Sequence, residues 1–229
     1  MTKVVTDEEC MCVCLFNDLP IIADLCDIKG KRGVYYEVVI GKMDRIITIG
    51  NTSSAQLQSH GIATANTVHD RDCMPSTPSV GFPGWERLSV GLHPGDYRKF
   101  YEDPDGGRDY DNDGLLEEIS PGDSIGLGYE PASGTVFFTY NGTRLPSAFS
   151  GIYIPQDKYD VYVAIGVLGK DQFRVNFGTD TFKWREGNDW AWKVEGHVGN
   201  FAGSPGGDAG ELPNRQEAVR IERNQVLGE

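Results

Sequence analysis

The chain has 229 residues, a formal net charge of −13 and a hydrophobic fraction of 39%. This length suits one large all-β domain, or one domain followed by a tail. The excess of carboxylates would repel a phosphate backbone, so we do not expect nucleic acid as a partner. No segment approaches the roughly 20 apolar residues of a membrane span, and the N-terminus lacks a signal-peptide pattern.

The cysteine and histidine patterns do not resemble a metal site. Cys10, Cys12 and Cys14 alternate, which would place them on one face of a strand, and Cys26 and Cys73 stand apart. A zinc site would need paired C-x-x-C spacing with a second ligand pair. We therefore expect no metal and no cofactor. The odd number of cysteines favours reduced thiols and a cytoplasmic location.

Strand and turn signals recur at short spacing along the chain, while helix signals are scarce. The Val34–Ile40 segment is β-branched and aromatic, and Asn141-Gly142 is a strong signal for a two-residue hairpin turn. This pattern predicts an all-β fold, a two-sheet antiparallel β-sandwich. The predicted strands cover residues 34–40, 45–49, 87–92, 124–129, 135–140, 160–167 and 172–177.

Three regions do not fit the sandwich pattern. Residues 51–80 are polar and predict a long loop, and residues 102–118 predict an acidic loop. Residues 196–229 are Gly-rich and then polar, which predicts a flexible tail in which residues 215–226 form either a short helix or an edge strand. We therefore assign residues 1–195 to one domain, with an N-terminal strand extension and a core over 31–185.

Two motifs resemble catalytic or metal-binding patterns. Gly122–Gly126 matches G-x-S-x-G, but the nucleophile elbow needs a strand before its serine and a helix after it, and here a strand pattern follows Ser124. Asp109, Asp111 and Asp113 begin like a calcium loop, but Ser120 stands where the pattern needs glutamate. We expect neither a catalytic serine nor a structural calcium ion.

Several strings in their order and spacing resemble the SPRY domain, over roughly residues 31–185. The strings are similar to those of the SPRY domains of Ran-binding protein M and of fungal endosomal and vacuolar adaptors of ubiquitin ligases. The strings are Val34–Val38, Phe82–Gly91, Asp96–Phe100, Gly122–Tyr129, Gly134–Gly142 and Val175–Gly178.

This resemblance implies a sandwich without catalytic activity that binds a peptide or partner protein through loops at one edge. The corresponding segments are Asp24–Arg32, the segment ending in Phe82–Arg87, and Leu168–Asp171. Cations beside exposed apolar groups would suit a short peptide of aliphatic and acidic character. The candidate partner-binding residues are Arg32, Trp85, Arg87, Leu168 and Lys170.

The fungal adaptors carry P-P-x-Y motifs and a membrane span, which this sequence lacks. A role in substrate recognition at endosomal or vacuolar membranes would therefore need further parts of a longer adaptor. The main alternative is a carbohydrate-binding, lectin-like sandwich, and a secreted effector is a further one. A glucanase would need two carboxylates beside the scissile bond, and the Val34–Ile40 strand offers only Glu37.

Overall fold

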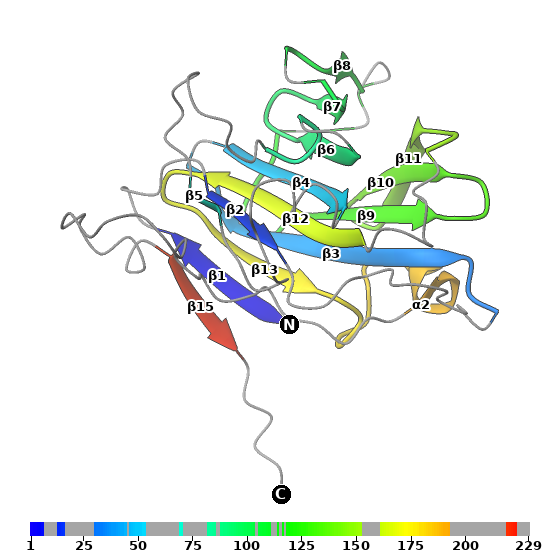
Figure 1. Ribbon diagram of the computed structural model, residues 1–229. Coiled ribbons are helices and arrows are strands. Elements are labelled where there is room, and N and C mark those ends of the chain that lie inside the picture. Colours follow the sequence, from blue (N-terminus) through cyan, green and yellow to red (C-terminus); the bar gives the residue numbers. More distant parts are fainter. Residues whose placement is uncertain are drawn as a thin grey trace, which may run out of the picture.

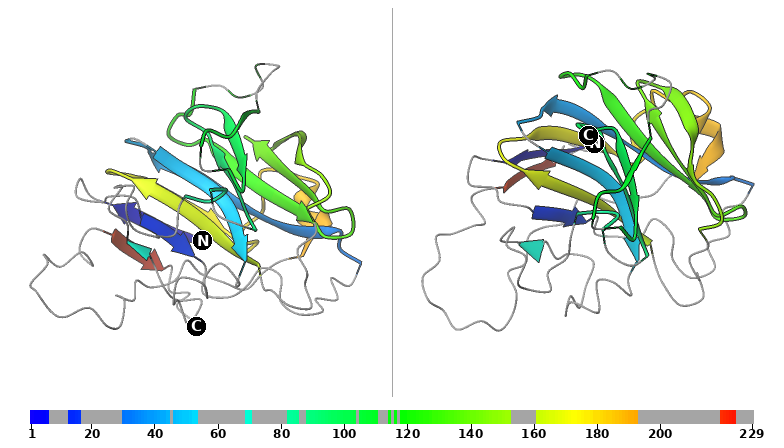
Figure 2. Two further views of the ribbon diagram at one scale, coloured as in Figure 1. Left: turned by 45° about the horizontal axis from the view of Figure 1, so that its top comes forward. Right: turned by 90° about the horizontal axis from the view of Figure 1, so that it is seen from above.

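The structure is a computed structural model. It describes residues 1–6, 13–16, 30–44, 46–53, 69–70, 82–85, 88–103, 105–110, 114, 116, 118–152, 161–192 and 219–223. These residues form two sheets that pack face to face as a β-sandwich (Figures 1 and 2). All strand pairs are antiparallel except one short parallel pair, so the predicted all-β sandwich is confirmed.

The first sheet, called sheet A, has the order β11-β10-β9-β3-β13-β1-β15, and β14 pairs with β3 outside this path. A short helix, α2 (Gly187–Trp190), leads into β14. The strands are β1 (Thr2–Thr6), β3 (Gly33–Lys42), β9 (Ser124–Glu130), β10 (Thr135–Tyr140), β11 (Thr143–Phe149), β13 (Gln172–Asn176), β14 (Ala191–Trp192) and β15 (Val219–Arg223).

The second sheet, called sheet B, has the order β5-β2-β12-β4-β6-β7-β8. Its last three strands follow one another in sequence and form the upper part of the molecule in Figure 1. The strands are β2 (Val13–Phe16), β4 (Ile46–Ser53), β5 (His69–Asp70), β6 (Ser89–His93), β7 (Arg98–Tyr101), β8 (Arg108–Asp109) and β12 (Val161–Leu168).

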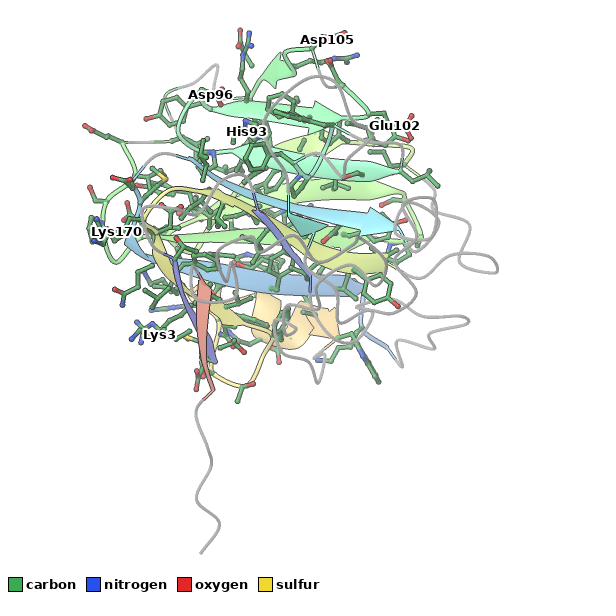
Figure 3. The ribbon with its side chains drawn as sticks, turned by 60° about the vertical axis from the view of Figure 1, so that its left-hand side comes forward. Lys3, His93, Asp96, Glu102, Asp105 and Lys170 are labelled. Atoms are coloured by element: carbon green, nitrogen blue, oxygen red, sulfur yellow. The ribbon has the colours of Figure 1, made fainter. Side chains whose placement is uncertain are left out.

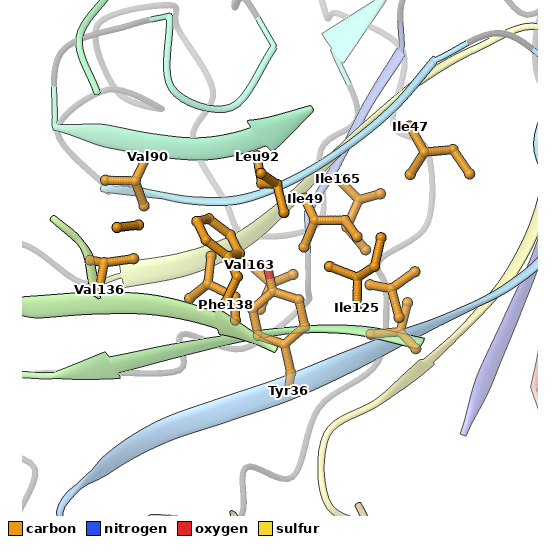
Figure 4. Packing of buried hydrophobic residues seen from close by; sticks show 14 of the residues in the cluster. Tyr36, Ile47, Ile49, Val90, Leu92, Ile125, Val136, Phe138, Val163 and Ile165 are labelled. Atoms are coloured by element: carbon orange, nitrogen blue, oxygen red, sulfur yellow. The ribbon is translucent and has the colours of Figure 1, made fainter. Parts of the chain in front are cut away.

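The main core lies between the two sheets and follows the alternation of side chains along each strand (Figure 4). On β9, Ile125, Leu127 and Tyr129 point into this core. The small residues of β9 lie on the outer face, where a Cβ on Gly126 or Gly128 would collide with the aromatic side chains of neighbouring strands. Small residues are therefore required on that face because large rings from β3 and β10 lie across it.

A second, aromatic cluster covers the outer face of sheet A. It consists of Tyr35, Phe137, Phe182, Trp184, Trp190 and Ala191. The ring centroids of Tyr35 and Trp184 are 4.9 Å apart, and those of Phe137 and Trp190 are 5.3 Å apart. Edge contacts of this kind contribute beyond the buried area alone. The cluster attaches the segment after β13 to the sheet.

The outer face of sheet B is covered by the segment Phe82–Trp85. Gly50, Gly91 and Gly166 lie beneath it, and a Cβ on any of the three would collide with Phe82 or Pro83. The Ser89 hydroxyl accepts a hydrogen bond from Gly84 N at 2.7 Å. Glycines in three neighbouring strands thus let an irregular segment lie close against the sheet.

Several sequence expectations need revision in detail. Strands β7, β8, β11 and β14 were not among the predicted segments, β1 and β2 lie in the expected N-terminal strand extension, and β5 lies inside the predicted long loop. Within the predicted tail, β15 pairs antiparallel with β1, so residues 219–223 form an edge strand and not a helix. The rest of the tail, the residues around β5, Cys10 and Cys12 lie outside the described residues. None of the helices in the described part of the chain is long and apolar enough to cross a membrane.

The β10–β11 turn confirms the predicted hairpin. Asn141 has φ 47° and Gly142 has φ 85°, as a two-residue turn of this type requires. We expect Gly142→Val to destabilise the domain by about 1–3 kcal/mol, because a β-branched residue is strained at positive φ. A Cβ at this position would also lie 2.7 Å from the carbonyl oxygen of Lys183. The measurement is the melting temperature, and an unchanged value would contradict the turn assignment.

Candidate functional site

Arg32 lies just before β3, and 68% of its side chain is exposed. Its Nε and Nη2 donate hydrogen bonds to Glu130 Oε1 at 3.2 and 2.9 Å. The hydroxyl of Ser133 donates to the other carboxylate oxygen at 2.6 Å. This hydrogen bond and the Arg32 guanidinium lower the pKa of Glu130. Arg32 is thus exposed but already paired within the domain.

Leu168 is the last residue of β12, where it pairs with Ile46 of β4, and Lys170 lies in the turn that follows. Both are beside the end of β3 where Lys42 pairs with Gln172. Leu168 is half-buried and Lys170 is exposed. A strand rises roughly 3.3 Å per residue, so the two ends of β3 lie about 30 Å apart. Arg32 and Lys170 therefore occupy opposite ends of the sandwich. Figure 3 shows that Lys170 also lies far from Glu102, the residue that follows β7.

Trp85 lies over the outer face of sheet B and is half-buried. Its ring centroid is 5.1 Å from that of Phe82 and 6.1 Å from that of His93. Arg87 lies outside the described residues. The structure thus separates the predicted residues into three places, and their contribution to partner binding stays a prediction.

The turn that carries Lys170 is held by a reciprocal pair of aspartates. Asp44 N donates to Asp171 Oδ1 at 2.8 Å, and Lys170 N donates to Asp44 Oδ2 at 3.3 Å. Thr6 Oγ1 donates to the carbonyl oxygen of Gly169 and accepts from Asp171 N at 2.7 Å. The β3–β4 and β12–β13 turns are therefore tied together and to the end of β1.

An open groove of about 290 Å³ lies where β7 and β8 of sheet B face the edge strand β11 of sheet A. We call it the edge groove. It contains aromatic, cationic and acidic side chains from all three strands and from the loop after β7. The lining residues are Lys99, Tyr101, Glu102, Asp103, Arg108 and Phe149.

The alternation along β7 explains which side chains line the groove. Phe100 faces the outer side, where its ring lies 4.1 Å from that of His93. Lys99 and Tyr101 therefore face the inner side, and the Tyr101 and Phe149 ring centroids are 5.8 Å apart. In β8, Arg108 is the cross-strand partner of Lys99. Two cations thus stand side by side above two half-buried rings.

The Lys99 ammonium lies over aromatic rings and forms no ion pair with a carboxylate of the described residues. Its Nζ is 5.0 Å from the Tyr110 ring centroid and 5.5 Å from that of Phe149. Partial burial, and secondarily the nearby Arg108 guanidinium, lower the pKa of Lys99. The neighbouring Arg98 is different, because its guanidinium pairs with Asp109 at 3.4 Å and donates to the Gly106 carbonyl at 2.6 Å. The Arg98 side chain therefore stabilises the β7–β8 hairpin through these two contacts, while the Lys99 side chain faces the groove.

Sequence reasoning did not select the edge groove. Arg108 is the single base within the predicted acidic loop of residues 102–118, and Lys99 lies within the string Asp96–Phe100 that resembles the family. Phe149 belongs to a strand that was not predicted. The alternation of Lys99 and Tyr101 would have placed these two on one face, but no local signal relates that face to β11.

The two chemistry-like motifs are also located. Ser124 is buried and opens strand β9, so a strand and not a helix follows it, as expected. Of the calcium-like loop, Asp109 lies in β8 and pairs with Arg98, while Asp111 and Asp113 lie outside the described residues. In the part of the chain that the structure describes, no three Cys, His, Asp or Glu side chains gather in a metal-binding arrangement.

Several known proteins are similar in sequence to part of this chain. Protein ssh4 of Sclerotinia sclerotiorum is 32% identical over 128 residues, which are 56% of this chain and 23% of that protein. Protein ssh4 of Neurospora crassa is 31% identical over 128 residues, again 56% of this chain and 24% of that protein. A SPRY domain-containing protein of Schizosaccharomyces pombe is 28% identical over 128 residues, or 56% of this chain and 30% of that protein.

The chain thus spans less than a third of the length of these relatives. A crystal structure of a human SPRY domain aligns with 74% of this chain and 88% of that chain, at 22% identity and a TM-score of 0.48. The family model described as SPRY domain matches residues 33–180, from the start of β3 to just past β13. This match covers more than half of the chain, which therefore belongs to the SPRY domain family.

Proposed function

We propose that this SPRY domain binds a segment of a partner protein, without catalysis, and that the edge groove is its contact surface. The observation that carries the proposal is the open groove itself, where Lys99 and Arg108 stand beside the half-buried rings of Tyr101 and Phe149. Aromatic and arginine side chains supply most of the binding energy at protein interfaces. A rigid sandwich also holds such a surface in one shape.

We further propose that the domain is the substrate-recognition part of a longer ubiquitin-ligase adaptor that acts in the cytoplasm at endosomal or vacuolar membranes. The support is the similarity to the ssh4 proteins, of which the chain spans about a quarter, together with the resemblance of the sequence strings to fungal adaptor SPRY domains. In this role the domain contributes recognition, while ligase recruitment and membrane attachment belong to other segments.

The test is a pull-down from cell lysate, quantified by mass spectrometry, with the full chain as bait. We expect Lys99→Glu with Arg108→Glu to reduce partner capture at least about fivefold, because charge reversal replaces attraction by repulsion. Arg174→Glu with Arg185→Glu is the matched control, since both residues are exposed and lie outside the groove. The control makes the same change in net charge and should leave capture at the wild-type level.

A second pair of changes tests the turn that the sequence analysis selected. Leu168→Ala with Lys170→Glu alters the opposite end of the sandwich without touching the groove. If this pair abolishes capture while the groove variant retains it, the binding surface is the β12–β13 turn and not the groove. If the folded wild-type chain captures no specific partner, the proposed function itself is wrong.

A further inference from the structure

The edge groove contains an arrangement of charges that costs stability in the isolated domain. Lys99 and Arg108 are direct cross-strand partners in the β7–β8 ladder. Like charges placed opposite each other in a sheet repel, and opposite charges at the same positions would stabilise it. Neither cation forms an ion pair with a described carboxylate, whereas Arg32 and Arg98 both do. The groove therefore offers two positive charges that an anionic group can neutralise.

The acidic side chains of the groove do not serve this purpose because hydrogen bonds hold them to the backbone. Glu102 Oε1 accepts from Leu88 N at 2.7 Å, and Asp103 Oδ1 accepts from Asp105 N at 3.1 Å. Both hydrogen bonds fix the loop that follows β7. The cations and the acids thus occupy successive parts of the groove, with the cations over the β7–β8 ladder and the acids beyond the end of β7.

The rings beside the cations add an apolar component. Tyr101 and Phe149 are each half-buried and meet at an interplanar angle of 51°, so neither ring is fully covered by the domain. A volume of about 290 Å³ is at the small end of ligand sites, which run from roughly 300 to 1,000 Å³. The groove therefore has room for one or two side chains of a peptide and not for a larger element.

From these observations we propose that the edge groove selects a peptide segment in which an acidic side chain lies next to a large apolar or aromatic one. This inference rests on the proposed function and names the chemistry of its partner. The carboxylate lies between the Lys99 ammonium and the Arg108 guanidinium, where charge-assisted hydrogen bonds are strongest. The neighbouring apolar side chain packs on the rings of Tyr101 and Phe149.

The net charge of −13 does not oppose this selection at physiological salt. The Debye length there is about 8 Å, so charges farther than this from the groove are largely screened while direct contacts are not. Recognition is therefore decided by the groups inside the groove and immediately around it.

The experiment begins with selection of random peptides displayed on phage against the immobilised full chain. We expect the enriched peptides to carry Asp or Glu beside Trp, Phe, Tyr or Leu. The most enriched peptide is then synthesised in two versions that differ only in the acid or its amide, Glu or Gln, Asp or Asn. The amide version should bind the wild-type domain about tenfold more weakly, as expected for the loss of one partner of a charge pair.

A double-mutant cycle relates this loss to the two cations. In Lys99→Gln with Arg108→Gln, the acidic peptide should lose about tenfold in affinity, and the difference between the two peptides should vanish. Arg174→Gln with Arg185→Gln is the matched control and should keep the full difference. The proposal is overturned if the enriched peptides lack an acid, if the amide binds equally well, or if the difference survives in the groove variant.

These outcomes are separate from the failure of the proposed function. If no displayed peptide binds while the pull-down still loses partners with the charge-reversed groove, the peptide chemistry is wrong and the binding surface stands. If the pull-down is also unaffected by the groove variant, both proposals are wrong.

Discussion

Alanine in place of Glu37 is expected to lower the free energy of unfolding by about 3–5 kcal/mol. Glu37 lies on β3 with only 2% of its surface exposed. Its Oε1 accepts hydrogen bonds from Tyr35 Oη at 2.8 Å and Trp184 N at 3.0 Å, and its Oε2 accepts one from Lys183 N at 3.0 Å. Removing the carboxylate leaves two amide groups without acceptors and releases the segment that carries the outer aromatic cluster.

The measurement is equilibrium unfolding in urea, followed by tryptophan fluorescence. Glu37→Gln keeps one acceptor oxygen and should lose less stability than Glu37→Ala. Glu186→Ala is the matched control, because Glu186 is an exposed carboxylate beside the same segment and its side chain does not cap α2. Exposed substitutions of this kind stay within about 0.5 kcal/mol of the wild type. A loss below about 1 kcal/mol in Glu37→Ala would show that the carboxylate does not hold the segment.

The second large effect is a pair of opposing pH dependences. Burial lowers the pKa of His93 to about 4, with a smaller opposing contribution from Asp96. Burial raises the pKa of Asp171 to about 6, and the Asp44 carboxylate adds to that rise, while the hydrogen bond from Asp44 N and the Leu168 backbone oppose it. Between pH 4 and 6, the folded chain holds a proton on Asp171 and none on His93. The unfolded chain does the reverse.

The signs of the two contributions follow from proton binding. An ordinary histidine has a pKa near 6.5, so unfolding takes up a proton at position 93 and stability falls as the pH drops from about 6.5 to 4. An ordinary aspartate has a pKa near 3.9, so unfolding releases a proton at position 171 and stability falls as the pH rises from about 4 to 6. Each contribution amounts to about 3 kcal/mol, and over the shared window they nearly cancel.

Single substitutions should separate the two contributions. Asp171→Asn should lose about 3 kcal/mol more stability than the wild type between pH 6 and pH 4, because the His93 contribution is no longer opposed. His93→Gln should change in the other direction and gain stability relative to the wild type over the same interval. The measurement is urea unfolding at several pH values. Comparison with the wild type cancels the titration of the other carboxylates.

Asp189→Asn is the control for these measurements, because Asp189 is exposed and its profile should run parallel to that of the wild type. If Asp171→Asn also runs parallel, the Asp171 carboxyl has an ordinary pKa and the β12–β13 turn does not bury it. If His93→Gln runs parallel, His93 is reached by water on the outer face of sheet B.

Local sequence signals were sufficient to predict the central strands of the two sheets, β10-β9-β3-β13 and β12-β4-β6. Ile125, Leu127 and Tyr129 alternate with small residues, and this alternation decides which face of β9 packs into the main core. Asn141-Gly142 specifies its turn because both positions have positive φ, which is a property of the two residues themselves. The two-sheet sandwich was predicted from repeated signals of this kind, whereas the SPRY resemblance rests on the order and spacing of six sequence strings.

The candidate site depends on relations that no local pattern contains. Lys99 and Arg108 belong to the edge of sheet B, while Phe149 belongs to the edge of sheet A, and only the strand order and the packing of the sheets bring them together. For the same reason Arg32 and Lys170 lie at opposite ends of β3, although a family resemblance suggested one edge. Alternation determines which face a side chain occupies, but pairing across the sandwich determines what lies opposite that face.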